Sequence, residues 1–168
     1  MRKLLVILLL MATCMGGAWA GDRDRFIGIN VGVLHPKVFD ITAAYEWETR
    51  YHNAWEMYLD VTTQWKTCET CNKVCWDSFW KNRNSFAVGL AYKPQVVRSR
   101  NWTVRGRLGA DVGTHNRHFG LGIEAGLEAA LSLRNRVQLV LQQKNEVTFW
   151  GKPTWKNGLL VGIKIPLN

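Results

Sequence analysis

The stretch that decides the fold reads FGLGIEAGLEAAL and covers residues 119–131. Apolar side chains occupy every second position from Phe119 to Leu127, and glycine or glutamate fills the positions between them. This period of two is typical of a β-strand, because successive side chains of a strand point to opposite faces. One face of the segment should therefore contact an apolar medium, and the other should carry Glu124 and Glu128.

The same alternation recurs in seven further segments of the chain. No convincing helical pattern separates these segments, so consecutive strands should pair as antiparallel neighbours joined by hairpins. Eight such strands can close into a barrel, which leaves no unpaired sheet edge. We predict an all-β protein, an eight-stranded antiparallel up-and-down β-barrel. The other seven segments cover residues 27–33, 39–48, 55–65, 86–92, 102–112, 137–144 and 159–167.

The beginning of the chain has the pattern of a secretory signal peptide. Two basic residues precede an apolar run over residues 4–11, and the small-residue motif Ala18-Trp19-Ala20 follows. We expect residues 1–20 to be removed and residues 21–168 to form one barrel domain. An uncleaved anchor is the alternative, although the apolar run is short for a spanning helix.

Two kinds of barrel alternate in this way, and they differ in which face lies outside. A soluble ligand carrier places its apolar face inside, whereas a transmembrane barrel reverses this arrangement. The polar positions of this chain combine charged residues with Gly and Ala, which suits the crowded interior of an eight-stranded barrel. We therefore predict a transmembrane barrel with a charged lumen, and a secreted soluble barrel is the alternative. The predicted lumenal residues are Glu46, Glu56, Asp60, Arg105, Arg107, Glu124, Glu128 and Lys144.

Aromatic residues gather at the ends of the predicted strands. Interfaces between membrane and water select such residues, so two aromatic belts should mark the two rims of a barrel in the outer membrane. The strands, at about 9–11 residues, are long enough to cross a bilayer when tilted. The predicted interface residues are Trp47, Trp55, Tyr92 and Trp102 at one rim, and Trp65, Phe119, Phe149 and Trp155 at the other.

An even number of strands places both chain ends on the periplasmic side. The periplasmic turns should then cover residues 50–53, 93–101 and 133–136, and the outer loops residues 34–38, 66–85, 113–118 and 150–157.

The chain carries a formal charge of +9, and basic loop residues such as Lys156 could meet phosphates of outer-membrane lipid and lipopolysaccharide. Ordinary solvated loop charge is the alternative. The basic residues form no single patch, which argues against direct binding of nucleic acid.

Cys68, Cys71 and Cys75 lie in the longest predicted loop. Removal of the signal peptide leaves these three cysteines, an odd number. One local disulfide with one free thiol, intermolecular pairing and three reduced thiols all stay open. A zinc site would need a fourth ligand, and the spacing matches no zinc pattern. We predict no metal and no cofactor.

Few residues are arranged for catalysis. His115 and His118 lie near the predicted outer rim, where lipid A-modifying barrel enzymes use a histidine and a serine. No serine follows them at a useful spacing, and Ser85 begins a strand that is not expected to neighbour that of His118. We predict no enzymatic activity and no small-molecule substrate, with a lipid A-modifying enzyme as the alternative.

The C-terminal part of the chain contains a series of short motifs. They are the Gly-rich segment from Phe119, Leu131-Ser132 with Arg136, the run LVLQ at residues 139–142, Val147, the Trp150-Gly151 pair and a final Gly-rich strand. Together with INVGVL at residues 29–34, they resemble the conjugal transfer protein TraO family of conjugative transposons in Bacteroides-type bacteria. The usual terminal Phe of that family is replaced here by Leu167-Asn168.

This resemblance implies an outer-membrane component of a DNA-transfer apparatus. Its partners would be other conjugation proteins, and the family offers no catalytic residues to carry over. A general envelope or adhesion barrel is the alternative.

Overall fold

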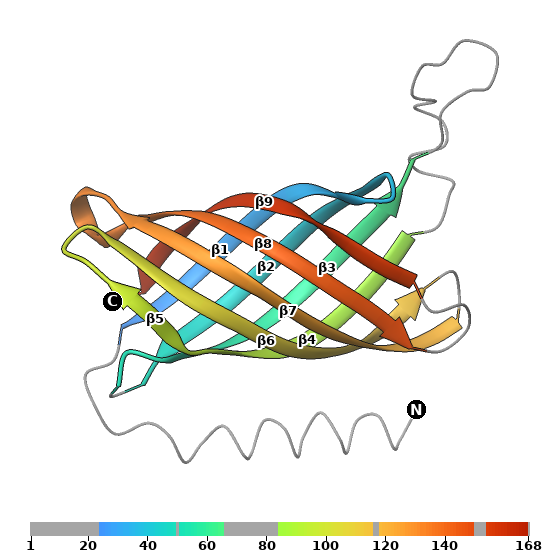
Figure 1. Ribbon diagram of the computed structural model, residues 1–168, viewed down its shortest axis with the longest axis horizontal. Coiled ribbons are helices and arrows are strands. Elements are labelled where there is room, and N and C mark those ends of the chain that lie inside the picture. Colours follow the sequence, from blue (N-terminus) through green and yellow to red (C-terminus); the bar gives the residue numbers. More distant parts are fainter. Residues whose placement is uncertain (1–23, 50, 66–83, 116–117, 150–153, 168) are drawn as a thin grey trace, which may run out of the picture.

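The computed structural model describes residues 24–49, 51–65, 84–115, 118–149 and 154–167, and most of these residues are in β-strands (Figure 1). The predicted signal peptide and the three-cysteine loop lie outside the described residues. In the part of the chain that is described, no helix is long and apolar enough to cross a membrane. The strands are β1 (Arg25–His35), β2 (Val38–Glu48), β3 (Ala54–Gln64), β4 (Asn84–Lys93), β5 (Gln95–Arg98), β6 (Trp102–His115), β7 (His118–Ser132), β8 (Gln138–Phe149) and β9 (Thr154–Leu167).

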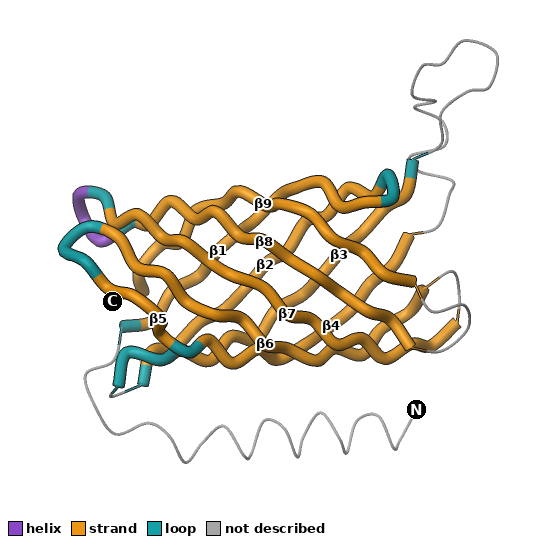
Figure 2. The backbone as a smooth tube through the Cα atoms, in the orientation of Figure 1, coloured by secondary structure: helices purple, strands orange, loops and turns teal. Residues whose placement is uncertain are grey.

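The strands form one closed antiparallel barrel, with short turns joining several of them at the end where β9 finishes (Figure 2). The sheet order is β4-β3-β2-β1-β9-β8-β7-β6-β5, and an additional pairing of β4 with β6 closes the ring. β4 pairs with β6 up to Tyr92↔Leu108, and β5 continues along β6 in the same register at Gln95↔Arg105, before the register shifts between Gln95 and Val97. β4 and β5 therefore act as one interrupted strand, and the predicted eight-stranded antiparallel barrel is confirmed.

One predicted turn is shorter in the structure than expected, because part of it forms the strand β5. Residues 93–101 were expected to form a turn, but Lys93 ends β4 and Gln95–Arg98 form β5. Pro94 has no N–H to donate, yet its carbonyl accepts a hydrogen bond of 2.9 Å from the Gly106 nitrogen. Strand pairing resumes beyond the proline, and only residues 99–101 are left to make the turn.

The outer loops are also shorter than predicted. β1 extends to His35, β6 ends at His115, β7 begins at His118, and β9 begins at Thr154. Regular pairing continues past the last clear apolar position of each strand, because a ladder needs only backbone groups. The alternation of apolar and polar residues therefore fades before the strands themselves end.

Burial follows the predicted alternation. Ile123 is 56% exposed, whereas its neighbour Glu124 is 1% exposed. The outward positions of β1 show the same contrast, with Ile29 and Val33 exposed and Asn30 fully buried. A closed barrel with an aliphatic outer surface and a polar interior is the arrangement of transmembrane barrels.

The predicted interface aromatics lie near the two ends of the barrel. Trp55 and Tyr92 pack at a ring-centroid distance of 5.1 Å, near the end where β1 begins and β9 finishes. Trp47 and Trp102 lie at that same end, at the finish of β2 and the start of β6. At the opposite end lie Trp65, Phe119, Phe149 and Trp155.

Glycines make room for large side chains in the interior. Tyr58 is 1% exposed, and a Cβ atom at Gly89 would overlap its ring. Small apolar clusters fill further interior space without any charge. One consists of Leu34, Val38 and Leu160.

Candidate functional site

The interior of the barrel holds most of the buried charge of the described residues. All eight of the residues predicted to line the lumen lie there and are buried. Further charged side chains join them at inward positions. They are Asp40, Glu48, Lys93, Asp111, Glu146, Lys156 and Lys164.

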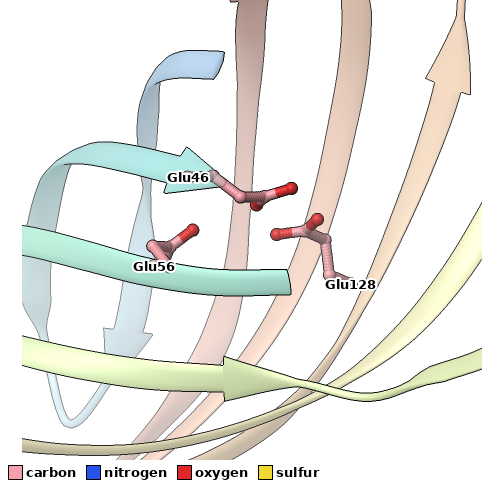
Figure 3. Close-up of side chains that lie close together, drawn as sticks. All are labelled: Glu46, Glu56 and Glu128. Carbon is pink, nitrogen blue, oxygen red and sulfur yellow. The ribbon is translucent and has the colours of Figure 1, made fainter. Parts of the chain in front are cut away.

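Three glutamates from different strands converge on one lysine. Figure 3 shows Glu46 of β2, Glu56 of β3 and Glu128 of β7 pointing toward one another. One carboxylate oxygen from each lies within 4.8 Å of the others. The Lys93 ammonium donates to Glu46 at 2.9 Å, to Glu128 at 2.5 Å and also to Glu56. These oxygens could hold a metal ion, but the lysine ammonium already occupies the position that a cation would take.

Other basic side chains extend this group. Lys164 donates to Glu46 at 2.6 Å and also to Glu128. Arg105 donates to Glu46 at 2.6 Å and also contacts Glu48. We call this group the proximal cluster, because it lies toward the chain-end side of the barrel. Its members are Glu46, Glu48, Glu56, Glu124, Glu128, Lys93, Lys164, Arg105 and Arg107.

Arg107 joins two of the predicted lumenal glutamates. Its guanidinium donates twice to Glu56, at 2.9 and 3.1 Å, and forms an ion pair with Glu124. Its charged carbon also lies 4.6 Å from the centre of the Tyr58 ring, a cation–π contact. The arginine therefore ties β3, β6 and β7 together across the lumen.

A second group, the distal cluster, lies toward the other end. Its centre is Lys144 of β8, whose ammonium donates to Asp40 at 3.0 Å and to Asp60. The Thr42 hydroxyl donates to Asp60 at 2.5 Å, which holds that carboxylate in place. The members of the distal cluster are Asp40, Asp60, Asp111, Glu146, Lys144 and Lys156.

Lys156 corrects a prediction. It was expected in an outer loop, where it could meet lipid phosphates, but it is 3% exposed and donates to Glu146 at 2.7 Å inside the barrel. The predicted loop was too long, and β9 carries this residue inward. The sequence does contain a signal for this position: Trp155 points outward, so its neighbour Lys156 should point inward. Tyr92 gives the same indication for Lys93.

Acidic side chains outnumber basic ones in both clusters, although the whole chain has a formal charge of +9. The excess positive charge therefore lies outside the lumen. An acidic, filled interior would repel a nucleic acid strand, whose phosphates need basic partners.

The strand ladder places Ser85 and the two histidines relative to one another. Because β4 pairs directly with β6, Ser85 lies opposite His115, and His115 lies opposite His118. The order of the predicted strands already implied that β4 pairs with β6. Ser85 of β4 and His118 of β7 lie on strands that are not neighbours, as the sequence indicated. The backbone positions of one serine and two histidines thus meet at the distal end.

Comparison with solved structures supports the fold. The chain is similar to a major outer membrane protein from Thermus thermophilus (TM-score 0.63, 11% identity, 88% of this chain and 100% of that chain covered). It is also similar to the de novo designed TMB2.3 (TM-score 0.54, 11% identity, 89% and 98% covered) and to the Yersinia pestis outer membrane protein Ail (TM-score 0.50, 10% identity, 86% and 100% covered).

At these identities the likeness concerns the fold alone. No family model matches the chain, and no curated protein sequence matches it. The fold and its neighbours identify an eight-stranded outer-membrane β-barrel.

Proposed function

We propose that this protein is a closed, non-catalytic barrel that serves as an envelope component through its rims and outer surface. The observation that carries the proposal is the filled lumen, in which Lys93 and Lys144 each bridge carboxylates from several strands. An eight-stranded barrel has an interior just wide enough for its own side chains. DNA or a solute of comparable size has no path through one molecule.

The energetics of the two clusters support a permanent plug. Among the described residues, Lys144 is the cation that pairs with Asp40 and Asp60, and Lys93 shares its three glutamates with Lys164, Arg105 and Arg107. Breaking a buried ion pair costs about 3–5 kcal/mol. Opening the lumen would break several pairs at once. A channel that opens in ordinary use would need a weaker set of contacts.

Planar-bilayer recording tests this part of the proposal. We expect the purified protein, inserted into a bilayer, to give no steady conductance steps in concentrated salt. The double variant Lys144→Ala/Lys156→Ala empties the distal cluster of both its cations and serves as a comparison. Steady single-channel steps from the unaltered protein would refute the closed barrel.

The resemblance to the TraO family extends the proposal to conjugative DNA transfer. In this view the barrel anchors other conjugation proteins at the outer membrane, and those proteins contact its turns or rims. The sequence motifs of the C-terminal third support this role. Deletion of the gene in a conjugative donor should lower transfer frequency, and the intact gene should restore it.

An unchanged transfer frequency would favour a general envelope or adhesion barrel instead. The gene neighbourhood gives a second test, since mating-pore genes on either side are expected for a transfer component. A protein of general envelope function has no reason to be encoded beside them.

The ladder positions of Ser85, His115 and His118 favour one second candidate, a lipid A-modifying enzyme. Such an activity would release fatty acid from lipopolysaccharide, and His118→Ala would abolish the release. Equal, background-level release from the unaltered protein and from this variant would rule the candidate out.

A further inference from the structure

The outer surface of the barrel is not uniform. On β1–β4, every outward residue away from the strand ends is aliphatic, aromatic or methionine. On β8, Gln143 and Asn145 point outward instead, between the inward Gln142, Lys144 and Glu146. Gln143 lies midway along its strand, at the depth where a transmembrane barrel meets hydrocarbon.

The outward amides form a compact group. Asn145 lies opposite Asn157 of β9 in the strand ladder, and its amide nitrogen donates to the Ala125 carbonyl at 3.2 Å. Gln143 lies between Leu127 and Leu159. Among the described residues, the side chains of Gln143 and Asn157 have no hydrogen-bond partner.

Unpartnered amides are costly in hydrocarbon. A polar group that loses water without gaining a hydrogen bond raises the free energy by roughly 2–7 kcal/mol. Lipid tails offer no donors or acceptors. Gln143 keeps such a group at mid-membrane depth, and this surface therefore calls for a polar partner within the membrane.

A groove on the same face is the second, independent observation. It has a volume of about 360 Å³ and adjoins Gln143 on the side toward the chain ends. Its lining combines the small residues Ala129, Ala130 and Gly162 with larger apolar ones, namely Trp102, Leu131, Leu139, Val140, Leu141 and Val161. Close contacts between transmembrane segments use small residues for approach and polar residues for hydrogen bonds. The small residues of the groove and the nearby amides supply these two elements, and the larger lining residues supply apolar contact area.

We infer that this surface, which we call the amide face, binds a second copy of the same chain within the membrane. An amide carries both donors and an acceptor, so Gln143 can pair with the Gln143 of an identical molecule. Two copies inserted in the same orientation are related by a two-fold axis along the membrane normal, and residues on that axis meet their own counterparts. The amide face consists of Ala125, Ala129, Leu141, Gln143, Asn145, Asn157 and Val161.

A homodimer explains both features at once. The amides satisfy each other, and apolar side chains of one copy, such as Leu127 and Leu159, fill the groove of the other. Both leucines are exposed, at 54% and 57%. The inference depends on the membrane barrel and not on any role in conjugation.

Sedimentation equilibrium in density-matched detergent micelles tests the inference. We expect the unaltered protein to dimerise and Gln143→Leu to weaken association about tenfold, as the loss of two membrane hydrogen bonds of average strength would do. Ala129→Trp should fill the groove and abolish dimers. Ala43→Trp, which adds the same side chain to an outward position of β2, is the matched control and should leave dimerisation unchanged. Heat-modifiable electrophoretic mobility verifies that each variant is folded.

Two results would overturn the inference. One is an unaltered protein that stays monomeric over the whole concentration range. The other is dimerisation that neither Gln143→Leu nor Ala129→Trp affects. A photo-crosslinker at Asn145 adds a test in native membranes, where it should capture a second copy of the chain. Capture of a different protein alone would also contradict the homodimer.

Discussion

Lys93→Met is the most direct test of the proximal cluster. Methionine keeps the approximate length of the lysine side chain but removes the charge that three glutamates share. Figure 3 shows these glutamates. Lys93 is 0% exposed, so water has no ready access to the site that the change creates. The variant isolates the electrostatic role of the lysine from its role in filling space.

The expected loss in the free energy of unfolding follows from the distances between the three carboxylates. Glu46, Glu56 and Glu128 have carboxylate oxygens within 4.8 Å of one another. At an effective dielectric constant of about 20, each of these pairs repels by roughly 3.5 kcal/mol or more. Lys164 still binds two of the three glutamates, and local rearrangement relieves part of the strain. We therefore expect the free energy of unfolding to fall by about 3–5 kcal/mol, the range for breaking a buried ion pair.

Urea unfolding in detergent micelles, followed by tryptophan fluorescence, measures the change. Arg136→Ala is the control, because Arg136 pairs with Asp24 at 3.3 Å in an exposed ion pair at the same end of the barrel. That change should cost less than about 1 kcal/mol. Adding Glu56→Gln to Lys93→Met should recover part of the lost stability, since it removes one of the repelling charges. A loss below about 1 kcal/mol for Lys93→Met would refute the reasoning.

Three further predictions also concern the free energy of unfolding. Lys144→Met should cost about 3–5 kcal/mol, because it leaves Asp40 and Asp60 without their cationic partner; a neutral result would show that these two carboxylates are not ionised together. Gly89→Ala should cost about 1–3 kcal/mol, since the added methyl group meets the buried Tyr58 ring. Gly120→Ala is the control and should be nearly neutral, because the nearest atom to its added methyl group, in Thr148, is 3.4 Å away. Leu59→Arg in lipid vesicles should cost about 2–4 kcal/mol and Val96→Arg, near the rim, about 0–1 kcal/mol; equal costs would contradict the membrane depth assigned to Leu59.

The period-two pattern was enough to predict the fold, because membrane and lumen impose opposite demands on alternate residues. It failed where other effects govern the backbone. Pro94 interrupts the ladder without ending it, so β5 was assigned to a turn. At the outer ends, pairing through backbone groups extends β9 back to Thr154, which moved Lys156 from a loop into the lumen.

The pairing within the site was less accessible to sequence reasoning. Alternation assigns Glu46 and Glu128 to the interior, but their shared contact with Lys93 depends on the stagger of strands across the barrel. No local pattern contains that stagger. Gln143 and Asn145 were a missed signal of a different kind, because two outward amides interrupt the apolar face of β8 and are visible in the sequence itself.

The two clusters also explain how the barrel keeps its register. Lys144 of β8 bonds to Asp40 of β2 and Asp60 of β3, strands that lie across the lumen and are far apart in sequence. A slip of one residue along β8 would turn Lys144 toward the lipid, because side chains alternate between faces. A lysine at mid-membrane depth costs about 2–4 kcal/mol, and the lost ion pairs add to that cost. Apolar lumenal residues would resist the same slip less, since they would be tolerated on either face. The charged lumen thus favours one register for the whole barrel, in addition to closing it.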